Sequence, residues 1–277
     1  MSPDSNNVVV FIGGGNMASA LIGGLLKNGR APGSVRVVEP FEAQRDKLAK
    51  GFGVRAQPAA DASLAGAALV VWAVKPQLFA EAAAPCAAYI AQALQLSVMA
   101  GIRSEAIVAA SGSQRVVRAM PNTPALIGRG IAGLYARLAV SAAERSEVEA
   151  LLAPTGATLW VDREDDLDAV TALSGSGPAY VFYIVEAMMQ AGVGMGLSET
   201  QARQLALATF DGAAALAQAS PLHPSELRAQ VTSKGGTTHA AITTLDDSSV
   251  KDAFLRALHA AAIRAAELGD ELDAGAG

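Results

Sequence analysis

The sequence predicts an α/β domain with a doubly wound parallel sheet, followed by a second domain that contains only helices. Three observations support this division. Residues 8–18 read as a strand, a glycine-rich turn and a helix, strand-like and helix-like segments alternate up to Val161, and no clear strand follows the acidic cluster at residues 164–166. We therefore expect domains of residues 1–164 and 165–277.

The first strand and helix carry the spacing of a dinucleotide-binding turn. Residues 8–12 are an apolar, mostly β-branched run, and Gly13-x-Gly15-x-x-Ala18 matches the fingerprint in its alanine form. Gly13 permits the tight turn, Gly15 lets backbone approach a pyrophosphate, and Ala18 allows the helix to pack on the strand. The helix N-terminus would then face the anion. The alternative interpretation is a simple tight turn between a strand and a helix.

The second predicted strand, residues 34–39, ends on a carboxylate. Glu39 lies somewhat further along the chain than the usual separation of about 20 residues for the acid that binds an adenosine ribose. Glu39 is therefore either a ribose ligand or a solvated charge at a strand end. A helix over residues 42–50, a glycine stop and a short strand around Val54 complete this part of the pattern.

Two further apolar runs, residues 68–74 and 94–100, have the composition of central parallel strands. The first ends at Lys75, which places a cation where ligands bind in open α/β sheets. An exposed loop lysine is the alternative. After a helix that begins at Ser104, residues 115–120 form another predicted strand.

Two prolines frame Asn122 and Thr123 directly after that strand, so this rigid loop either presents both side chains to a ligand or is only a turn. Residues 131–135 and 157–161 are the last predicted strands. Between them Ser141 and Glu144 have the spacing of a capping box, which predicts a helix that ends near Leu152.

The remaining chain predicts helices over residues 179–192, 199–218, 224–231, 239–245 and 250–268. Before the first of them, Pro178 follows a run of small residues and suits a first helical turn. Between two later helices, Gly235 and Gly236 lie among hydroxyl residues just before a helix start. Such a turn forms a concavity of backbone N–H groups that suits a carboxylate or phosphate. A glycine-rich interhelical turn with a threonine cap is the alternative.

Composition excludes several classes of function. The net charge of -5 comes from 21 basic and 26 acidic residues that are well mixed along the chain, so no nucleic-acid partner is expected. No apolar run approaches the roughly 20 residues of a membrane span, and residues 1–7 lack a signal core, which predicts a cytoplasmic protein without membrane contact. The single cysteine, Cys86, and three unclustered histidines predict no metal site and a buried thiol.

Five segments together resemble the Δ1-pyrroline-5-carboxylate reductase family. They occur in the family's order over essentially the whole chain, and the last of them corresponds to the family's signature region. The segments are residues 11–17, 73–77, 118–125, 170–180 and, in the last region, His223, Pro224, Leu227, Val231, Ser233, Gly235, Gly236, Thr238, Ala241 and Ile242.

The resemblance implies an oxidoreductase that acts on CH–NH groups with NAD(P). It would reduce the C=N bond of Δ1-pyrroline-5-carboxylate with NADPH or NADH and give L-proline, the last step of proline biosynthesis. It also implies an N-terminal Rossmann domain and an all-α C-terminal dimerisation domain that interlocks with a partner's, in a homodimer or a larger ring of dimers. The apolar, alanine-rich second half fits such an interface.

The patterns and the resemblance together assign the site residues. The expected cofactor-binding residues are Gly13, Gly14, Gly15, Asn16, Met17, Glu39, Val74, Lys75, Pro76, Met99, Ala100 and Asn122. The expected substrate-binding residues are Ser174, Ser233, Gly235, Gly236, Thr237 and Thr238. Thr238, as hydrogen-bond partner of the ring nitrogen, and Lys75 are the catalytic candidates. The nicotinamide is expected to face the substrate held at residues 233–238.

The chain departs from the family pattern at three positions. Lys234 stands where many members have proline, and Ala60 stands where some carry an asparagine that contacts the adenosine. Glu39 stands where some have a small residue, so preference for NADPH over NADH does not follow from the resemblance. A β-hydroxyacid dehydrogenase, a general imine reductase and a nucleotide-sensing protein without catalysis are the alternatives.

Overall fold

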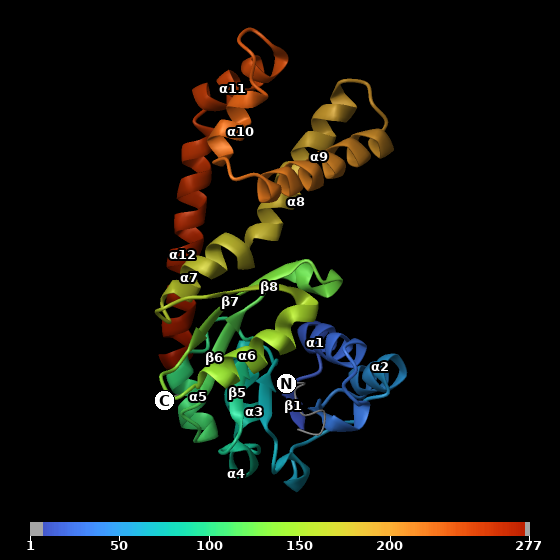
Figure 1. The fold of residues 1–277 in the computed structure, drawn as a ribbon, viewed down its shortest axis with the longest axis vertical. Coiled ribbons are helices and arrows are strands. Elements are labelled where there is room, and N and C mark those ends of the chain that lie inside the picture. The colour runs from blue at the N-terminus through green and yellow to red at the C-terminus, as the bar shows by residue number, and fades with distance from the viewer. Residues whose placement is uncertain (1–7, 275–277) are drawn as a thin grey trace. The chain divides into compact units, whose positions relative to one another are not determined.

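The computed structural model describes residues 8–274, and the chain divides into two compact units (Figure 1). The first unit contains residues 8–176 together with residues 261–274, and the second contains residues 177–260. The end of the last helix therefore groups with the sheet rather than with the other C-terminal helices.

The first unit is built on an eight-stranded sheet in the order β3-β2-β1-β4-β5-β6-β7-β8. The strands are β1 Val9–Ile12, β2 Val35–Val38, β3 Ala56–Gln57, β4 Leu69–Trp72, β5 Leu94–Ser97, β6 Val116–Met120, β7 Gly130–Ala136 and β8 Gly156–Trp160. The order reverses at β1, where β2 lies on one side and β4 on the other. Ligands bind at such a switch point, outside the carboxyl ends of the strands.

One strand pair corrects the prediction of a wholly parallel sheet. β7 runs antiparallel to β6, with Met120 opposite Gly133 and Val117 opposite Ala136. The link between the two strands, residues 121–129, is shorter than the dozen or more residues that a crossover between parallel strands needs. The chain therefore has to turn back on itself here, and the remaining pairs are parallel.

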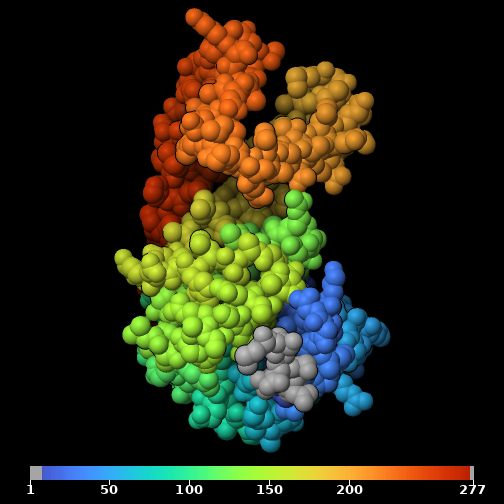
Figure 2. Space-filling model, in the orientation of Figure 1, coloured from blue at the N-terminus to red at the C-terminus, as the bar shows by residue number. Residues whose placement is uncertain are grey.

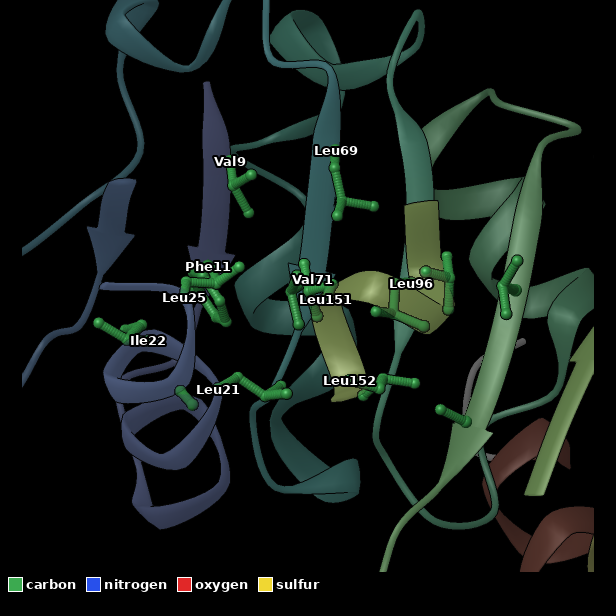
Figure 3. Close-up of a cluster of buried hydrophobic side chains, with 14 of the residues drawn as sticks. Val9, Phe11, Leu21, Ile22, Leu25, Leu69, Val71, Leu96, Leu151 and Leu152 are labelled. Atoms are coloured by element: carbon green, nitrogen blue, oxygen red, sulfur yellow. The ribbon is translucent and has the colours of Figure 1, made fainter. Parts of the chain in front are cut away.

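Helices cover both faces of this sheet, as predicted for a doubly wound fold. They are α1 Asn16–Lys27, α2 Glu42–Phe52, α3 Phe79–Ala83, α4 Ala87–Ile90, α5 Ser104–Ser111, α6 Ala142–Leu152 and α7 Asp166–Val170. One core packs Leu21 and Leu25 of α1 and Leu151 of α6 against β1 and β4 (Figure 3). A second core on the other face includes Trp72, and the space-filling view shows side chains closing the spaces between the ribbons (Figure 2).

Most predicted elements are confirmed, and the differences lie at their ends. The capping box of Ser141 and Glu144 begins α6. The strand predicted over residues 94–100 ends at Ser97, whose hydroxyl accepts a hydrogen bond from the Met99 amide at 3.2 Å and turns the chain. The strand expected around Val54 lies at Ala56–Gln57 because Gly53 first closes α2 in a left-handed conformation.

The second unit consists of helices, as predicted. They are α8 Gly177–Gly194, α9 Glu199–Ala219, α10 Pro224–Gln230, α11 Thr237–Asp247 and the first part of α12 Val250–Ala274. α11 begins before the expected His239 and α12 ends beyond the expected Leu268. None of the helices within residues 8–274 combines the length and hydropathy that a membrane span requires.

Candidate functional site

The first turn after β1 has a backbone that only glycine fits. Gly13 has φ of +96° and donates its N–H to the Val38 carbonyl at 2.9 Å. A Cβ added at Gly13 would lie 2.6 Å from the carbonyl oxygen of Ala73 and 3.0 Å from the Val74 side chain. The turn is therefore pressed between β2 and the end of β4, and any side chain here would push the strands apart.

Gly15 and Asn16 open this turn to solvent. A Cβ at Gly15 would meet no atom within 4 Å, and Gly15 and Asn16 are both exposed. Gly15 precedes α1, and no side chain caps this helix start. The first N–H groups of α1 therefore point outward without an intrahelical partner, beside the positive end of the helix dipole. These features fit the pyrophosphate of a dinucleotide.

Two side chains hold Gly14 from outside the turn. The Glu39 carboxylate accepts hydrogen bonds from the Gly14 amide at 2.9 Å and from the Phe41 amide at 2.9 Å. Gln44 of α2 donates to the Gly14 carbonyl. Glu39 is only 6% exposed, so the alternative of a solvated charge is wrong. Its carboxylate braces the glycine turn, and its role toward a ribose stays a prediction.

The carboxyl ends of β4 and β5 lie side by side, at the edge where the sequence analysis predicts the nicotinamide. The register sets Trp72 opposite Ser97, and the Val98 amide donates to the Trp72 carbonyl at 3.0 Å. Val74 and Pro76 are partly exposed, Lys75 and Ala100 are exposed, and the Met99 side chain is buried. Lys75 immediately precedes a short 3-10 turn that begins at Pro76.

Asn122 connects two parts of the first unit. Its amide nitrogen donates to the Ser174 carbonyl at 3.2 Å, and its amide oxygen accepts from the Ile131 N–H at 3.1 Å. Ser174 lies in a π-helical turn, Thr171–Gly175, and its hydroxyl donates to the Val170 carbonyl at 3.0 Å. These polar groups already have protein partners, so a contact of Asn122 with the cofactor or of Ser174 with the substrate stays a prediction.

The second candidate site is the turn before α11. Gly235 has φ of +77°, and the Gly236 amide donates to the Ser233 carbonyl at 3.0 Å. Gly236 precedes α11 and no side chain caps this helix start. The first amides of α11, including those of Thr237 and Thr238, therefore lack intrahelical partners. Thr238 is half-buried while Thr237 is exposed, and the arrangement suits a small carboxylate.

Metal and thiol chemistry receive no support within the described chain. Residues 8–274 contain no group of three or more His, Cys, Asp and Glu side chains placed to hold a metal ion. Cys86 is fully buried, as predicted, and burial raises the pKa of its thiol to about 11.

The sequence did not indicate Gln44, whose side-chain amide is the second group that contacts Gly14 of the glycine turn. Gln44 and Gly14 are far apart in the chain, and a glutamine in the first turns of a helix is usually solvated. Nothing in the local pattern distinguishes it from its neighbours. Only the packing of α2 beside α1 brings its amide to the Gly14 carbonyl.

Two family models match separate parts of the chain. Residues 8–101 match the model described as NADP oxidoreductase, coenzyme F420-dependent. Residues 164–268 match the model described as pyrroline-5-carboxylate reductase dimerisation. The two matches cover the glycine turn and the turn before α11, respectively.

Whole-length relatives agree with these models. A pyrroline-5-carboxylate reductase of Pseudomonas aeruginosa is 44% identical over 268 residues, which cover 95% of this chain and 97% of the relative. A pyrroline-5-carboxylate reductase structure from Coxiella burnetii has a TM-score of 0.88 and 34% identity over 95% of this chain and 98% of that chain. A pyrroline carboxylate reductase of Plasmodium falciparum, solved with NADP bound, has a TM-score of 0.85 and 26% identity over 96% and 99% of the two chains.

Proposed function

The chain belongs to the pyrroline-5-carboxylate reductase family, and we propose that it transfers a hydride from NADPH or NADH to the C=N bond of Δ1-pyrroline-5-carboxylate to give L-proline. The reaction is that of an oxidoreductase acting on CH–NH groups and completes proline biosynthesis. The observation that carries the proposal is the open glycine turn at the start of α1 in a chain with a second uncapped glycine turn before α11.

The first unit supplies the cofactor site of this proposal. Amides of Gly15, Asn16 and Met17 at the helix N-terminus bind the pyrophosphate, because the Gly14 amide is already held by Glu39. The nicotinamide occupies the edge formed by residues 74–76, 99–100 and 122, at the carboxyl ends of the strands. When bound, the dinucleotide supplies the hydride, and the protein contributes orientation and charge.

The turn before α11 supplies the substrate site. Amides of residues 233–238 bind the carboxylate, with Gly235 and Gly236 providing the backbone concavity. The Thr238 hydroxyl forms a hydrogen bond with the ring nitrogen as the protonated imine becomes an amine. A protonated imine is already electrophilic, so this step needs no strong general acid. Lys75 and Ser174 remain candidates for a catalytic and a substrate contact, respectively.

We include a homodimer, or a larger ring of dimers, in the proposal. The helices of residues 177–260 expose large apolar side chains, including Phe182 (64%), Tyr183 (72%) and Met195 (78%). Figure 2 shows an open hollow between the amber residues at the end of α8 and the orange residues of α10 and α11. Apolar surface of this extent marks a protein interface, and the match to the dimerisation model covers these helices. A cytoplasmic location without nucleic-acid partners also stays a prediction.

The proposal is tested by following NADH and NADPH oxidation with Δ1-pyrroline-5-carboxylate and by identifying proline as the product. Cofactor oxidation with equal formation of proline supports it. Tight dinucleotide binding without turnover favours a nucleotide sensor and contradicts the proposal. Faster turnover of acyclic 3-hydroxy acids or unrelated imines favours a β-hydroxyacid dehydrogenase or a general imine reductase. The two cofactors are compared in the same assay, because the residues do not decide between them.

A further inference from the structure

The last turns of α12 return to the first unit and pack against the loop that follows β5, residues 98–103. Arg103, at the end of this loop, forms ion pairs with Asp270 at 2.5 Å and with Asp273 at 2.7 Å. Arg103 and Asp273 are partly exposed, at 37% and 36%, while Asp270 is mostly exposed, at 71%. A segment far away in the sequence thus holds the end of a loop at the cofactor edge of the sheet.

Glycines on both sides make this contact close. A Cβ added at Gly101 would lie 2.8 Å from the Leu272 side chain, and Gly101 has φ of +77°. A Cβ added at Gly269 would lie 3.3 Å from the Arg103 guanidinium. Leu272 packs on the same core that includes Met99 and Ile102. The end of α12 and the loop are therefore complementary in shape as well as in charge.

Both ends of the loop are held by contacts that do not involve α12. Glu164 accepts hydrogen bonds from the Ser104 amide at 2.6 Å and from the Ser104 hydroxyl, and Arg118 forms an ion pair with Glu164 at 2.8 Å. These bonds anchor the start of α5, while the Val98 amide is held by β4. Between the two anchors, Met99 donates to Ser97 and packs in the core with Ile102, while Gly101 and Arg103 contact the end of α12.

We propose that the C-terminal turns of α12 act as a latch that sets the conformation of residues 98–103, with Arg103 as a positioning residue for the nicotinamide end of the dinucleotide. The inference rests on the proposed function, because it assigns the nicotinamide to the edge formed by this loop and residues 74–76. Arg103 touches neither cofactor nor substrate in this role. It acts through the backbone of Met99 and Ala100.

Two variants release the latch by different means. Arg103→Met removes both ion pairs and keeps the length of the side chain. Gly269→Val displaces the Arg103 guanidinium, because the added side chain would occupy its position. Valine has a helix propensity at least as high as that of glycine, so the substitution does not weaken α12 itself. Arg264→Met is the matched control, because within residues 8–274 Arg264 forms its ion pairs only with Glu267 and Glu271 of the same helix.

We expect Arg103→Met and Gly269→Val each to raise the KM for NADH and NADPH about five- to tenfold, with kcat at saturating cofactor within about twofold of wild type. Arg103→Lys should recover part of the change because it restores a cation. The double variant should be no worse than either single variant, since both break one contact. Arg264→Met should retain the wild-type KM. If Arg103 only stabilised the fold, its variants would lower the melting temperature without raising KM selectively over kcat.

The inference is overturned if the wild-type enzyme is active and both latch variants keep its KM for the dinucleotides. It is also overturned if Arg264→Met raises KM as much as Arg103→Met, because loosening of the whole helix would then be the cause. Inactivity of the wild-type enzyme with Δ1-pyrroline-5-carboxylate contradicts the proposed function instead. Fluorescence titration of the same variants with NADH and NADPH measures the latch effect without turnover.

Discussion

Replacing Glu39 should change cofactor preference and cofactor affinity for separate reasons. In the free protein the buried carboxylate holds the amides of Gly14 and Phe41, and a hydrogen bond to a charged group contributes about 1.5–3 kcal/mol. Glu39→Gln keeps one acceptor oxygen and turns an NH2 group toward the second amide, so it should lose about one such bond. Glu39→Ser is too short for either bond and should weaken binding of both dinucleotides more.

The effect on preference is electrostatic. If the carboxylate lies about 6 Å from the 2′-phosphate of NADPH, a single charge and a double charge repel by about 1.4–3 kcal/mol at an effective dielectric constant of about 40–80. Both variants remove this repulsion. We therefore expect the ratio of kcat/KM for NADPH to that for NADH to rise about ten- to hundredfold, even though binding of NADH weakens.

The assay compares kcat/KM for both cofactors at saturating Δ1-pyrroline-5-carboxylate and measures dissociation constants by fluorescence titration. Gln44→Met separates the two effects, because it removes the hydrogen bond to the Gly14 carbonyl without changing charge. It should weaken both cofactors equally. Glu42→Gln removes an exposed charge of the same helix and should change neither quantity. An unchanged cofactor ratio in both Glu39 variants would refute the reasoning and place this side chain away from the ribose.

Thr238→Ala should lower kcat by about tenfold or more while the dissociation constants of NADH and NADPH stay the same, since one hydrogen bond to the reacting nitrogen is lost; an unchanged kcat in steady-state assays removes Thr238 from the mechanism. Burial alone would raise the pKa of Glu144. Hydrogen bonds with Ser141 at the start of α6 and with Arg115 outweigh this effect, so the pKa lies below the usual 4.5. Its carboxylate therefore stabilises the fold above pH 4.5 and loses this effect as the pH falls through the lowered value, so Glu144→Gln should reduce the melting temperature at pH 7 and less at lower pH. Cys86, with a pKa of about 11, should react with a disulfide reagent at pH 8 only after denaturant is added, because about 0.1% of the thiol is ionised; rapid labelling of the native protein would contradict its burial.

Much of the fold was predictable because its signals are local. The apolar run before Gly13, the glycine spacing and the capping box of Ser141 and Glu144 each depend on residues within one turn or strand. The direction of β7 was predicted wrongly, although the link that precedes it, residues 121–129, is too short for a crossover between parallel strands. The alternation of strands and helices favoured a parallel strand, and the minimum length of a crossover overruled it.

The two glycine turns were predictable because they are formed by the backbone. A glycine turn before a helix exposes amides wherever it occurs, so residues 13–17 and 233–238 could be named without coordinates. Side chains that reach across the fold could not. The partners of Glu39 and Asn122 are set by packing, and both side chains turned out to have protein partners that no sequence spacing indicated.

The sequence by itself determined the order of strands and helices, the two glycine turns and the family, because backbone preferences, apolar periodicity and motif spacing are written along the chain. Only the tertiary structure decided that Glu39 and Gln44 hold the glycine turn and that the end of α12 packs on residues 98–103. The reason is physical: these contacts join residues far apart in the sequence. Their geometry exists only after the sheet and its helices have packed.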